Sequence, residues 1–412
     1  MRKMIIYVIL AIELICIVSA GCTRTNKEMD NTSITLSLPA AMASSPEASP
    51  DALSRLSEKE YLPTKENVKL LGRTYPTGNS LWLALSGTGI EFTFTGAKAE
   101  LTLLGDNIIG SATAECNYCR YGIYVNDKLV IDDLLKEKNK VITVFDSTQI
   151  ETVTIRVIKL SESASSTLGI GKIKVLSEGT VTPAPNKVHR IEFIGDSITC
   201  GYGVDNPDRR GTFSTQTEDV TKTYAYKTAQ ALNADYSIVA FSGYGVLSGH
   251  TANGVINTRG LLPIYYDKMG FSYGAFDNQI RVDTITWNFS LFVPDIIVIN
   301  LGTNDYSYCK KDVNKKIEFA LAYVSFLKQI RERNPDAVIL CTLGMMGDKL
   351  YPYVRAAVST YRKDTGDTKV YSMRFAVEKA SDGYGTKMHP SPITHEKAAK
   401  KLTSLLQTLM DW

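Results

Sequence analysis

Hydrophobic and polar positions follow two different patterns along the chain, with the change near residue 180. From about residue 66 to residue 178, short apolar runs rich in β-branched and aromatic residues are separated by Gly, Asn and Asp, as in "GIEFTFTG" and "ETVTIRVIKL". Runs of this length and spacing, without helical periodicity, are typical of a β-sandwich or jelly roll. We therefore predict a β-sandwich jelly-roll domain over residues 63–180.

The second pattern begins after a linker rich in Pro and Gly, "SEGTVTPAPNK" at 177–187. Five apolar runs, from "RIEFIG" to "KVYSMRF", alternate with segments such as 312–335, in which apolar positions recur every three or four residues. Strands that alternate with helices predict a parallel sheet covered by helices on both faces. We predict an α/β domain with a five-stranded parallel sheet over residues 188–412.

The first 22 residues predict a secretory signal. A basic start is followed by an apolar stretch that is short for a bilayer span and carries Glu13. "SAGC" at 19–22 resembles a bacterial lipoprotein cleavage box, with Cys22 as the lipidated residue, although Ser19 stands where Leu is usual. A plain signal peptide cut near Ala20 is the alternative. Both predict export, and lipidation would anchor the protein to a bacterial membrane. Residues 23–62 are polar and rich in Ser, Ala and Pro, which predicts a flexible tether.

Composition adds few constraints. The 412 residues are 44% hydrophobic and 22% charged, and 46 basic residues against 43 acidic ones give a net charge of +3. This charge balance gives no reason to expect nucleic acid as a partner. Cys116 and Cys119 form one C-x-x-C pair with no second pair at zinc spacing, so we expect no metal, while a local disulfide stays open. No cofactor is expected, and the oligomeric state is not predicted.

Candidate chemistry gathers where strands end. "GDS" follows the first strand of the α/β domain, "SGYG" the second and "GTND" the third, and "DGYGTKMHPS" follows the fifth. Ligands of parallel sheets bind beyond the carboxyl ends of the strands, so these residues are expected to meet. Acyl transfer to water needs such a set: a serine activated by a base, and donors for the oxyanion. Ser197 is the candidate nucleophile, and the N–H groups of Ser197 and Gly243 and the side chain of Asn304 are the candidate donors.

Four histidines compete for the role of base. His189 precedes the first strand and is expected at the opposite end of the sheet, while His395 is expected inside the last helix. His389 lies in the loop after the fifth strand, and "HPSP" predicts a capped helix start that fixes this loop. We predict His389 as the base, with His250 in the loop after the second strand as the alternative.

These motifs carry a resemblance. In order, they are similar to the four blocks of the SGNH (GDSL-type) hydrolases, and with "LLGRTYP" and "GIEFTFTG" the chain resembles carbohydrate esterase family two over about residues 66–410. Members join an N-terminal jelly roll to a flavodoxin-like SGNH hydrolase domain. The resemblance implies an acetyl xylan esterase-like enzyme with Ser197 as nucleophile, His389 as base, and Ser197, Gly243 and Asn304 around the oxyanion. It also implies removal of acetyl groups from plant polysaccharides or oligosaccharides, often from the sugar 6-hydroxyl.

One position departs from the pattern of that superfamily. Many members carry Asp three residues before the catalytic His, where this chain has Thr386. Some members are thought to use a Ser–His dyad, which here predicts that the Lys387 carbonyl accepts the Nδ1–H of His389. Folding back of Asp382 is the alternative. The dyad is favoured because a neutral acceptor can still fix the tautomer.

Three further residues near the motifs have predicted roles. Asp196 is expected to stabilise its own turn and Asp305 to cap the helix that follows it. Tyr244 lies between two cleft glycines and is predicted to stack on a sugar face, with a merely exposed loop tyrosine as the alternative.

Together these features predict a serine carbohydrate O-acetylesterase acting on acetylated xylan or glucomannan. The alternatives are an SGNH hydrolase of lipid esters or thioesters, and a non-catalytic carbohydrate-binding lipoprotein. Ser197, Asn304 and His389 occur together, which a binding module would not need. The expected partner is therefore an acetylated glycan substrate, and contact with a membrane is expected only through the lipid at Cys22.

Overall fold

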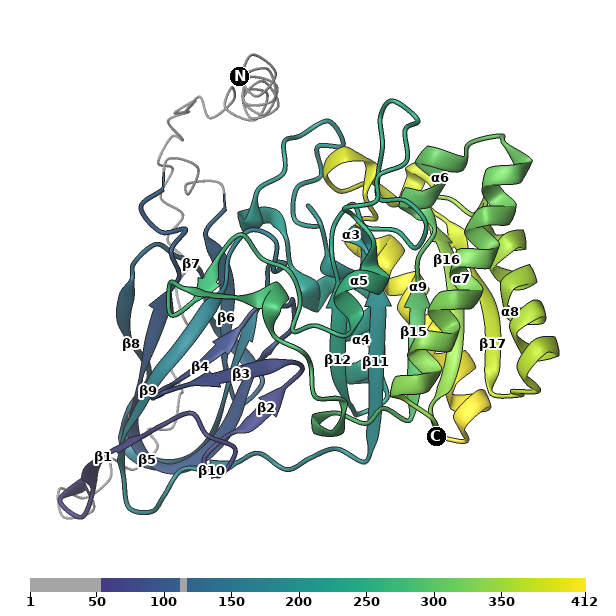
Figure 1. Cartoon of the computed structure of the whole chain (residues 1–412). Coiled ribbons are helices and arrows are strands. Elements are labelled where there is room, and N and C mark those ends of the chain that lie inside the picture. Colours follow the sequence, from purple (N-terminus) through teal and green to yellow (C-terminus); the bar gives the residue numbers. More distant parts are fainter. Residues whose placement is uncertain (1–52, 112–116) are drawn as a thin grey trace, which may run out of the picture. The chain divides into compact units, whose positions relative to one another are not determined.

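A computed structural model describes residues 53–111 and 117–412 (Figure 1). The predicted signal, Cys22, most of the predicted tether and Cys116 lie outside these residues. In the described part, Cys119 is a buried free thiol. No helix among the described residues is both long and apolar enough to cross a membrane.

Antiparallel strands make up the N-terminal part of the fold, as predicted. Their order is β3-β4-β9-β5-β8-β6-β7, with β1 beside β9 and β2 and β10 beside β5. The strands are β1 (Ser57–Tyr61), β2 (Lys69–Leu71), β3 (Thr74–Thr77), β4 (Ser80–Leu83), β5 (Gly89–Gly105), β6 (Cys119–Val125), β7 (Lys128–Leu135), β8 (Asn139–Lys159), β9 (Leu168–Ser177) and β10 (Thr182–Pro183).

The core of this part comes from residues that alternate along the strands. In β5, buried residues such as Phe92, Phe94, Leu101 and Leu103 recur at every second position, which is the period of a strand with one buried face. The pairing of β5 with β8 shifts register between Gly96 and Lys98, where a bulge bends the long strand. The bulge lets β5 pair with β2 and β10 before this point and with β9 after it.

The second part is the predicted α/β fold. Its parallel sheet has the order β12-β11-β15-β16-β17, which is the flavodoxin-like order 2-1-3-4-5. The sheet strands are β11 (His189–Gly195), β12 (Ala234–Ala240), β15 (Ile296–Asn300), β16 (Val338–Met345) and β17 (Val370–Val377), with a small hairpin of β13 (Ala275–Phe276) and β14 (Ile280–Arg281). The helices are α3 (Ser197–Cys200), α4 (Tyr224–Ala231), α5 (Leu262–Tyr266), α6 (Thr303–Cys309), α7 (Val313–Arg333), α8 (Tyr351–Thr365) and α9 (Pro392–Met410).

Helices cover both faces of this sheet. One buried cluster joins α4 and α9 to one face, through residues such as Phe193 and Leu402. The other joins α5, α7 and α8 to the opposite face, through residues such as Ile194 and Phe326. Because Phe193 and Ile194 are neighbours on β11 yet pack on opposite sides, the strand is buried on both faces, which explains its continuous apolar run.

Buried polar contacts join the antiparallel strands to the parallel sheet. The guanidinium of Arg73, after β2, donates to the carbonyls of Tyr266 and Lys268 at 2.6 and 2.7 Å and pairs with Glu192 of β11 at 3.3 Å. Lys69 of β2 pairs with Asp235, at the start of β12, at 2.5 Å. A buried charge needs a partner, so these pairs fix the antiparallel part against the sheet.

Candidate active site

Ser197 stands at the carboxyl end of β11, where the strand turns into α3. Asp196 is the N-cap of this short helix and accepts the Ile198 N–H at 3.0 Å, which is the turn-stabilising role predicted for it. Gly195 is required here because a Cβ would lie 2.0 Å from Oγ1 of Thr199. Ser197 is 6% exposed, so its hydroxyl sits in a largely dry position at the sheet edge.

His389 lies near the C-terminus, in the loop before α9, and its side chain contacts Ser197. Its Nε2 lies 2.8 Å from Oγ of Ser197. The loop that carries it is tied to the loop after Ser197, because the Thr386 N–H donates to the Gly203 carbonyl at 3.1 Å. On the other side, Ser391 caps α9 by accepting the Thr394 N–H and also donates to the Asp382 carbonyl at 2.6 Å. The predicted helix start therefore holds the histidine loop in place.

The acceptor for the second ring nitrogen differs from the prediction. Nδ1 of His389 lies 2.9 Å from the carbonyl oxygen of Thr386, rather than bonding to that of Lys387. The φ angles of Lys387 and Met388 are +52° and +63°, and this tight left-handed turn brings the carbonyl three residues back under the ring. The Lys387 carbonyl still contributes by raising the pKa of the imidazole. Asp382 is turned away and pairs with Lys397 at 2.6 Å.

This acceptor sets the tautomer of His389. A carbonyl oxygen can only accept, so Nδ1 carries the proton and donates it to Thr386, which leaves Nε2 free to accept from the Ser197 hydroxyl. Burial lowers the pKa of His389 to about 4, and the two backbone carbonyls oppose this effect. The imidazole is therefore neutral near pH 7 and able to take a proton.

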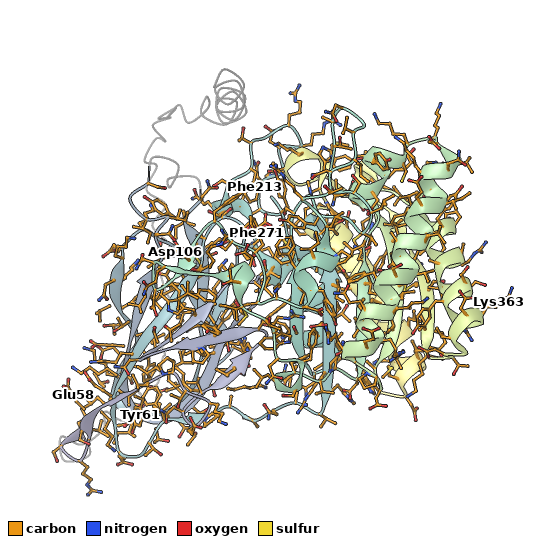
Figure 2. All side chains as sticks on the ribbon, in the orientation of Figure 1. Glu58, Tyr61, Asp106, Phe213, Phe271 and Lys363 are labelled. Carbon is orange, nitrogen blue, oxygen red and sulfur yellow. The ribbon has the colours of Figure 1, made fainter. Side chains whose placement is uncertain are left out.

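An aromatic stack packs against this imidazole. The ring of Tyr202 lies 4.2 Å from that of His389 at an interplanar angle of 26°, and Phe213 stacks on the other face of Tyr202 at 4.2 Å. Phe213 is labelled in Figure 2. Tyr202 comes five residues after Ser197, so the segment that carries Ser197 also covers one face of the His389 imidazole. Neither aromatic was singled out from the sequence.

Among the described residues, none of the other three histidines is hydrogen-bonded to Ser197. His189 opens β11 and stacks on Trp412 at 4.1 Å. His395 is buried in α9, where its Nδ1 accepts the Tyr224 N–H at 3.2 Å and burial lowers its pKa to about 3. His250 is exposed, and its backbone N–H donates to the Gly243 carbonyl at 2.7 Å. His389 is therefore the histidine that the fold brings to the serine.

The candidate oxyanion donors meet at the same edge because β11, β12 and β15 end in register. Gly195 is opposite Ala240 on one side and Asn300 on the other. Gly243 follows β12 with a φ of +83°, and a Cβ there would meet no atom within 4 Å, so the side of the turn where a side chain would stand is open. In residues 53–111 and 117–412, no protein acceptor takes the N–H of Ser197 or Gly243.

Asn304, near the start of α6, fixes the loop that carries Gly243. Its Nδ2 donates to the Tyr244 carbonyl at 2.8 Å and to Oδ2 of Asp196 at 3.2 Å. Asp196 thus links the turn that carries Ser197 to the amide of Asn304. Burial, with the nearby charge of Asp305, raises the pKa of Asp196 to about 7.

The role expected for Asp305 is wrong. Instead of capping its own helix, its carboxylate accepts the backbone N–H groups of Val246, Leu247 and Ser248 at 2.7 to 3.1 Å. Burial raises its pKa to about 6, although these three bonds stabilise the charged form. Asp305 therefore holds the segment after Gly243, a role that sequence spacing does not reveal.

Tyr244 belongs to an aromatic cluster rather than standing alone on a loop. Its ring lies 5.6 Å from that of Tyr265 and 6.3 Å from that of Phe271, and Phe271 (Figure 2) contacts Tyr273 at 5.2 Å. Tyr273 is 72% exposed. The cluster thus runs from the Gly243 turn to the surface, where aromatic rings can pack on an apolar sugar face.

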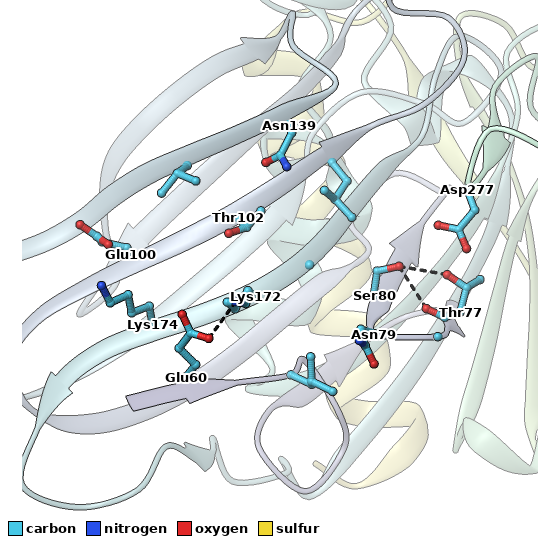
Figure 3. A pocket seen from close by; sticks show the side chains of 15 residues that line it. Glu60, Thr77, Asn79, Ser80, Glu100, Thr102, Asn139, Lys172, Lys174 and Asp277 are labelled. Carbon is cyan, nitrogen blue, oxygen red and sulfur yellow. Dashed lines mark hydrogen bonds and ion pairs between the residues drawn. The ribbon is translucent and has the colours of Figure 1, made fainter. Parts of the chain in front are cut away.

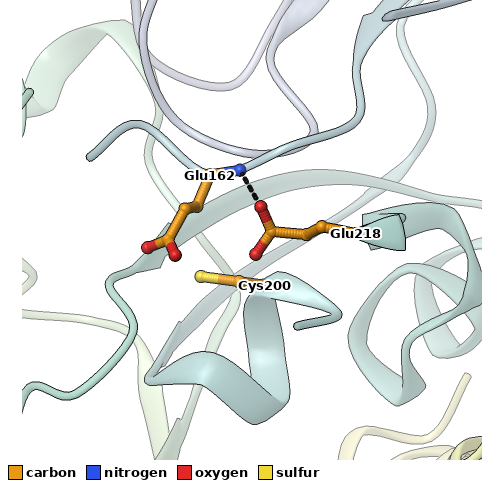
Figure 4. Close-up of side chains that lie close together, drawn as sticks. All are labelled: Glu162, Cys200 and Glu218. Carbon is orange, nitrogen blue, oxygen red and sulfur yellow. Dashed lines mark hydrogen bonds between the residues drawn. The ribbon is translucent and has the colours of Figure 1, made fainter. Parts of the chain in front are cut away.

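Further features of the described residues could hold a ligand, among them a side-chain cluster and a groove. Glu162, Cys200 and Glu218 place ligand atoms within 4.8 Å of one another, and Figure 4 shows a carboxyl oxygen of Glu218 turned toward Cys200. A groove of about 720 Å³ lies on the antiparallel strands (Figure 3), where Lys172 pairs with Glu60 at 2.8 Å. No aromatic side chain lines this groove, and neither Ser197 nor His389 does.

The two parts of the fold match two different protein families. Residues 191–402 match the family described as GDSL-like Lipase/Acylhydrolase, and residues 70–185 match the one described as Carbohydrate esterase 2 N-terminal. The cellulase/esterase CelE of Acetivibrio thermocellus is 34% identical over 254 residues, which are 59% of this chain and 29% of that protein.

Two further proteins are similar to this chain. An acetylxylan esterase / glucomannan deacetylase of Cellvibrio japonicus is 28% identical over 235 residues, 56% of this chain and 60% of that protein. The structure of an acetyl xylan esterase from the rumen bacterium Butyrivibrio proteoclasticus superposes with a TM-score of 0.77 and 25% identity, over 87% of this chain and 99% of that chain. The chain thus spans less than two thirds of the two sequence relatives.

Proposed function

Because the chain belongs to the GDSL-like lipase/acylhydrolase family and carries the N-terminal domain of carbohydrate esterase family two, we propose that it is a serine O-acetylesterase of plant polysaccharides. Ser197 is the nucleophile and His389 the general base. The observation that carries the proposal is the distance of 2.8 Å between Oγ of Ser197 and Nε2 of His389, with Nδ1 already donating to a carbonyl.

The reaction proceeds in two halves. Oγ of Ser197 attacks the acetyl carbonyl carbon while Nε2 of His389 takes the hydroxyl proton. The oxyanion accepts the N–H groups of Ser197 and Gly243 and the hydrogen of Asn304 that otherwise points at Asp196. The imidazolium then protonates the departing sugar oxygen, which leaves acetyl-Ser197. Water attacks this ester with His389 as base again, and acetate leaves.

The base works as part of a dyad in which a carbonyl replaces the usual carboxylate. The Thr386 carbonyl orients the ring, and no step needs a charged partner for Nδ1. The pairing of Asp382 with Lys397 supports this assignment, because a carboxylate engaged elsewhere is not available to the imidazole. The same chemistry proceeds without a metal ion.

Acetylated xylan or glucomannan is the proposed substrate, with the 6-hydroxyl as the preferred position. Support comes from the acetylxylan esterases among the relatives and from the aromatic cluster around Tyr244, which offers a stacking surface beside the Gly243 turn. A lipid ester is the second candidate and would favour an apolar surface at the nucleophile; the ring stacked on His389 is instead that of Tyr202, which carries a hydroxyl. A silent binder would have no use for the hydrogen bond between His389 and Ser197.

Export and anchoring complete the proposed function. The signal over residues 1–22 and a lipid on Cys22 would hold the enzyme at a bacterial membrane, with residues 23–62 as the tether. The sandwich over 63–180 and the hydrolase over 188–412 would then reach a polymeric substrate outside the cytoplasm.

Acetate release tests the proposal. The purified protein is incubated with acetylated xylan, acetylated glucomannan and an aryl acetate, beside long-chain aryl esters as the lipid-like arm. Acetate from the glycans, absent with Ser197→Ala, is the expected result. Hydrolysis of the long-chain esters alone would favour the lipid-ester alternative, and no release from any substrate would favour the binder.

A further inference from the structure

The segment between β8 and β9, residues 160–167, extends from the antiparallel strands to the candidate active site. It is largely buried. Its hydrogen bonds to the α/β part are Val220 N–H to the Leu160 carbonyl (3.2 Å), Tyr273 N–H to the Ala164 carbonyl (3.0 Å), Ser242 N–H to Oε2 of Glu162 (2.9 Å) and Glu162 N–H to Oε2 of Glu218 (2.7 Å). The segment therefore contacts three separate loops of the α/β part.

We propose that Glu162 is a positioning residue for the oxyanion donors. By accepting the Ser242 N–H, its carboxylate fixes the start of the turn whose next residue is Gly243, and so sets where the Gly243 N–H points. This inference rests on the proposed function, in which that N–H binds the oxyanion. It assigns the sandwich a part in the reaction besides packing.

The turn needs such a contact because no side chain packs where a Cβ of Gly243 would lie. Its virtual Cβ has no neighbour within 4 Å and its φ is +83°, so side-chain packing does not restrict it. Hydrogen bonds hold the rest of the loop: the His250 N–H donates to the Gly243 carbonyl, and Nδ2 of Asn304 donates to the Tyr244 carbonyl. The three N–H groups of residues 246–248 donate to the carboxylate of Asp305. Glu162 supplies the contact on the remaining side, ahead of Gly243.

The burial of Glu162 is itself evidence for a specific role. The side chain is 3% exposed, and burying a carboxyl costs free energy unless hydrogen bonds and charges compensate. Ser242 and the ammonium of Lys159 are the groups that lower its otherwise raised pKa. Lys159 gives its own hydrogen bonds to the carbonyls of Ser161 and Glu162, at 2.7 and 2.9 Å, and thereby shapes the segment around the carboxyl.

A metal ion is the other interpretation of these groups, and the contacts favour positioning. Of the carboxyl oxygens nearby, Oε2 of Glu162 already accepts from Ser242 and Oε2 of Glu218 from the Glu162 N–H (Figure 4). Oε1 of Glu218 is buried without a partner among the described residues, but the ammonium of Lys159 lowers the pKa of both carboxyls and so already offsets part of their negative charge.

Two substitutions at Glu162 and one matched control test the proposal. Glu162→Ala removes the acceptor, whereas Glu162→Gln keeps an oxygen for the Ser242 N–H. Lys69→Met is the control, since it removes another contact between the sandwich and β12, at the opposite end of that strand. The readouts are kcat and KM on an aryl acetate, and amide hydrogen exchange of the peptide that covers residues 241–247.

We expect the three variants to differ in kcat, in amide exchange and in thermal stability. Glu162→Ala should lower kcat about 10- to 100-fold with KM within about threefold, since small misplacement of a catalytic group has effects of this size. It should also speed exchange of the 241–247 peptide. Glu162→Gln should restore kcat to within a few-fold of wild type, and Lys69→Met should lower thermal stability and leave kcat unchanged.

The outcomes separate this inference from the proposed function. Unchanged exchange of 241–247 in Glu162→Ala overturns the positioning role whether or not the wild type is active. Faster exchange with unchanged kcat in an active enzyme overturns the link to the oxyanion. If the wild type is inactive and exchange is faster in Glu162→Ala, both the proposed esterase activity and the link to the oxyanion are overturned. Glu162 is then a structural support of the turn. Equal losses of kcat in Glu162→Ala and Lys69→Met would show that the effect is one of general stability.

Discussion

The carbonyl oxygen of Thr386 accepts two hydrogen bonds from His389, one from the backbone N–H at 3.1 Å and one from Nδ1 at 2.9 Å. One tight turn therefore fixes both the backbone and the ring of the proposed base. A carbonyl cannot lose its acceptor character on protonation in the working pH range, as a carboxylate can. The tautomer of His389 is thus fixed over a wide range of pH.

The pH dependence of activity follows from the pKa of His389. Burial lowers this pKa to about 4, below the ordinary value of 6.5, and the neutral form is the base. Activity should therefore persist as the pH falls from about 8 to about 5 and be lost through about pH 4, where the ring is protonated. We expect kcat/KM on an aryl acetate to show this acid limb. Because burial raises the pKa of Asp196 to about 7, its titration could also produce a limb in this range, and the profile is repeated with Asp196→Asn. A limb near 6.5 that remains in this variant would contradict the buried base.

Removing the ring of Tyr202 should move that acid limb. Tyr202→Ala lets water reach the imidazole, so the pKa of His389 should rise toward its ordinary value and the limb should shift upward by about one unit. Tyr202→Phe keeps the stacked ring and should leave the limb in place. The measurement is the pH profile of kcat/KM for the three proteins, and coincident profiles would show that Tyr202 does not shield the base.

The carboxylate of Asp382 should be dispensable. It pairs with Lys397 rather than His389, so Asp382→Asn should keep kcat within a few-fold of wild type. Lys397→Met is the control, because it breaks the same pair from the other side. A loss of about a thousand-fold in kcat with an unchanged circular dichroism spectrum would mean that Asp382 completes a triad.

The amide of Asn304 should matter for the chemical step. Asn304→Ala removes one oxyanion donor and is expected to lower kcat about 100- to 1,000-fold with little change in KM. Because Asn304 also bonds to the Tyr244 carbonyl, thermal melting should be recorded beside the kinetics. A rise in KM with an unchanged kcat would place Asn304 in ground-state binding instead.

Much of the site could be predicted from the sequence, because parallel strands bring their carboxyl ends to one edge. Ser197, Gly243 and Asn304 each follow an apolar run, and the capped start of α9 placed His389. The Thr386 acceptor could not be foreseen, since Lys387 and Met388 adopt positive φ without being Gly or Asn. Glu162 could not either, because its contact joins two parts of the chain that have separate sequence patterns.

Covalent labelling of Ser197 is the most direct test of its activation by His389. The protein is treated with a fluorophosphonate, which reacts with activated serines, and the modified peptide is located by mass spectrometry. We expect one modification, on Ser197, that is absent in Ser197→Ala and at least about 100-fold slower in His389→Ala, because the hydroxyl then has no base. Labelling of a different serine, or an unchanged rate in His389→Ala, would contradict it.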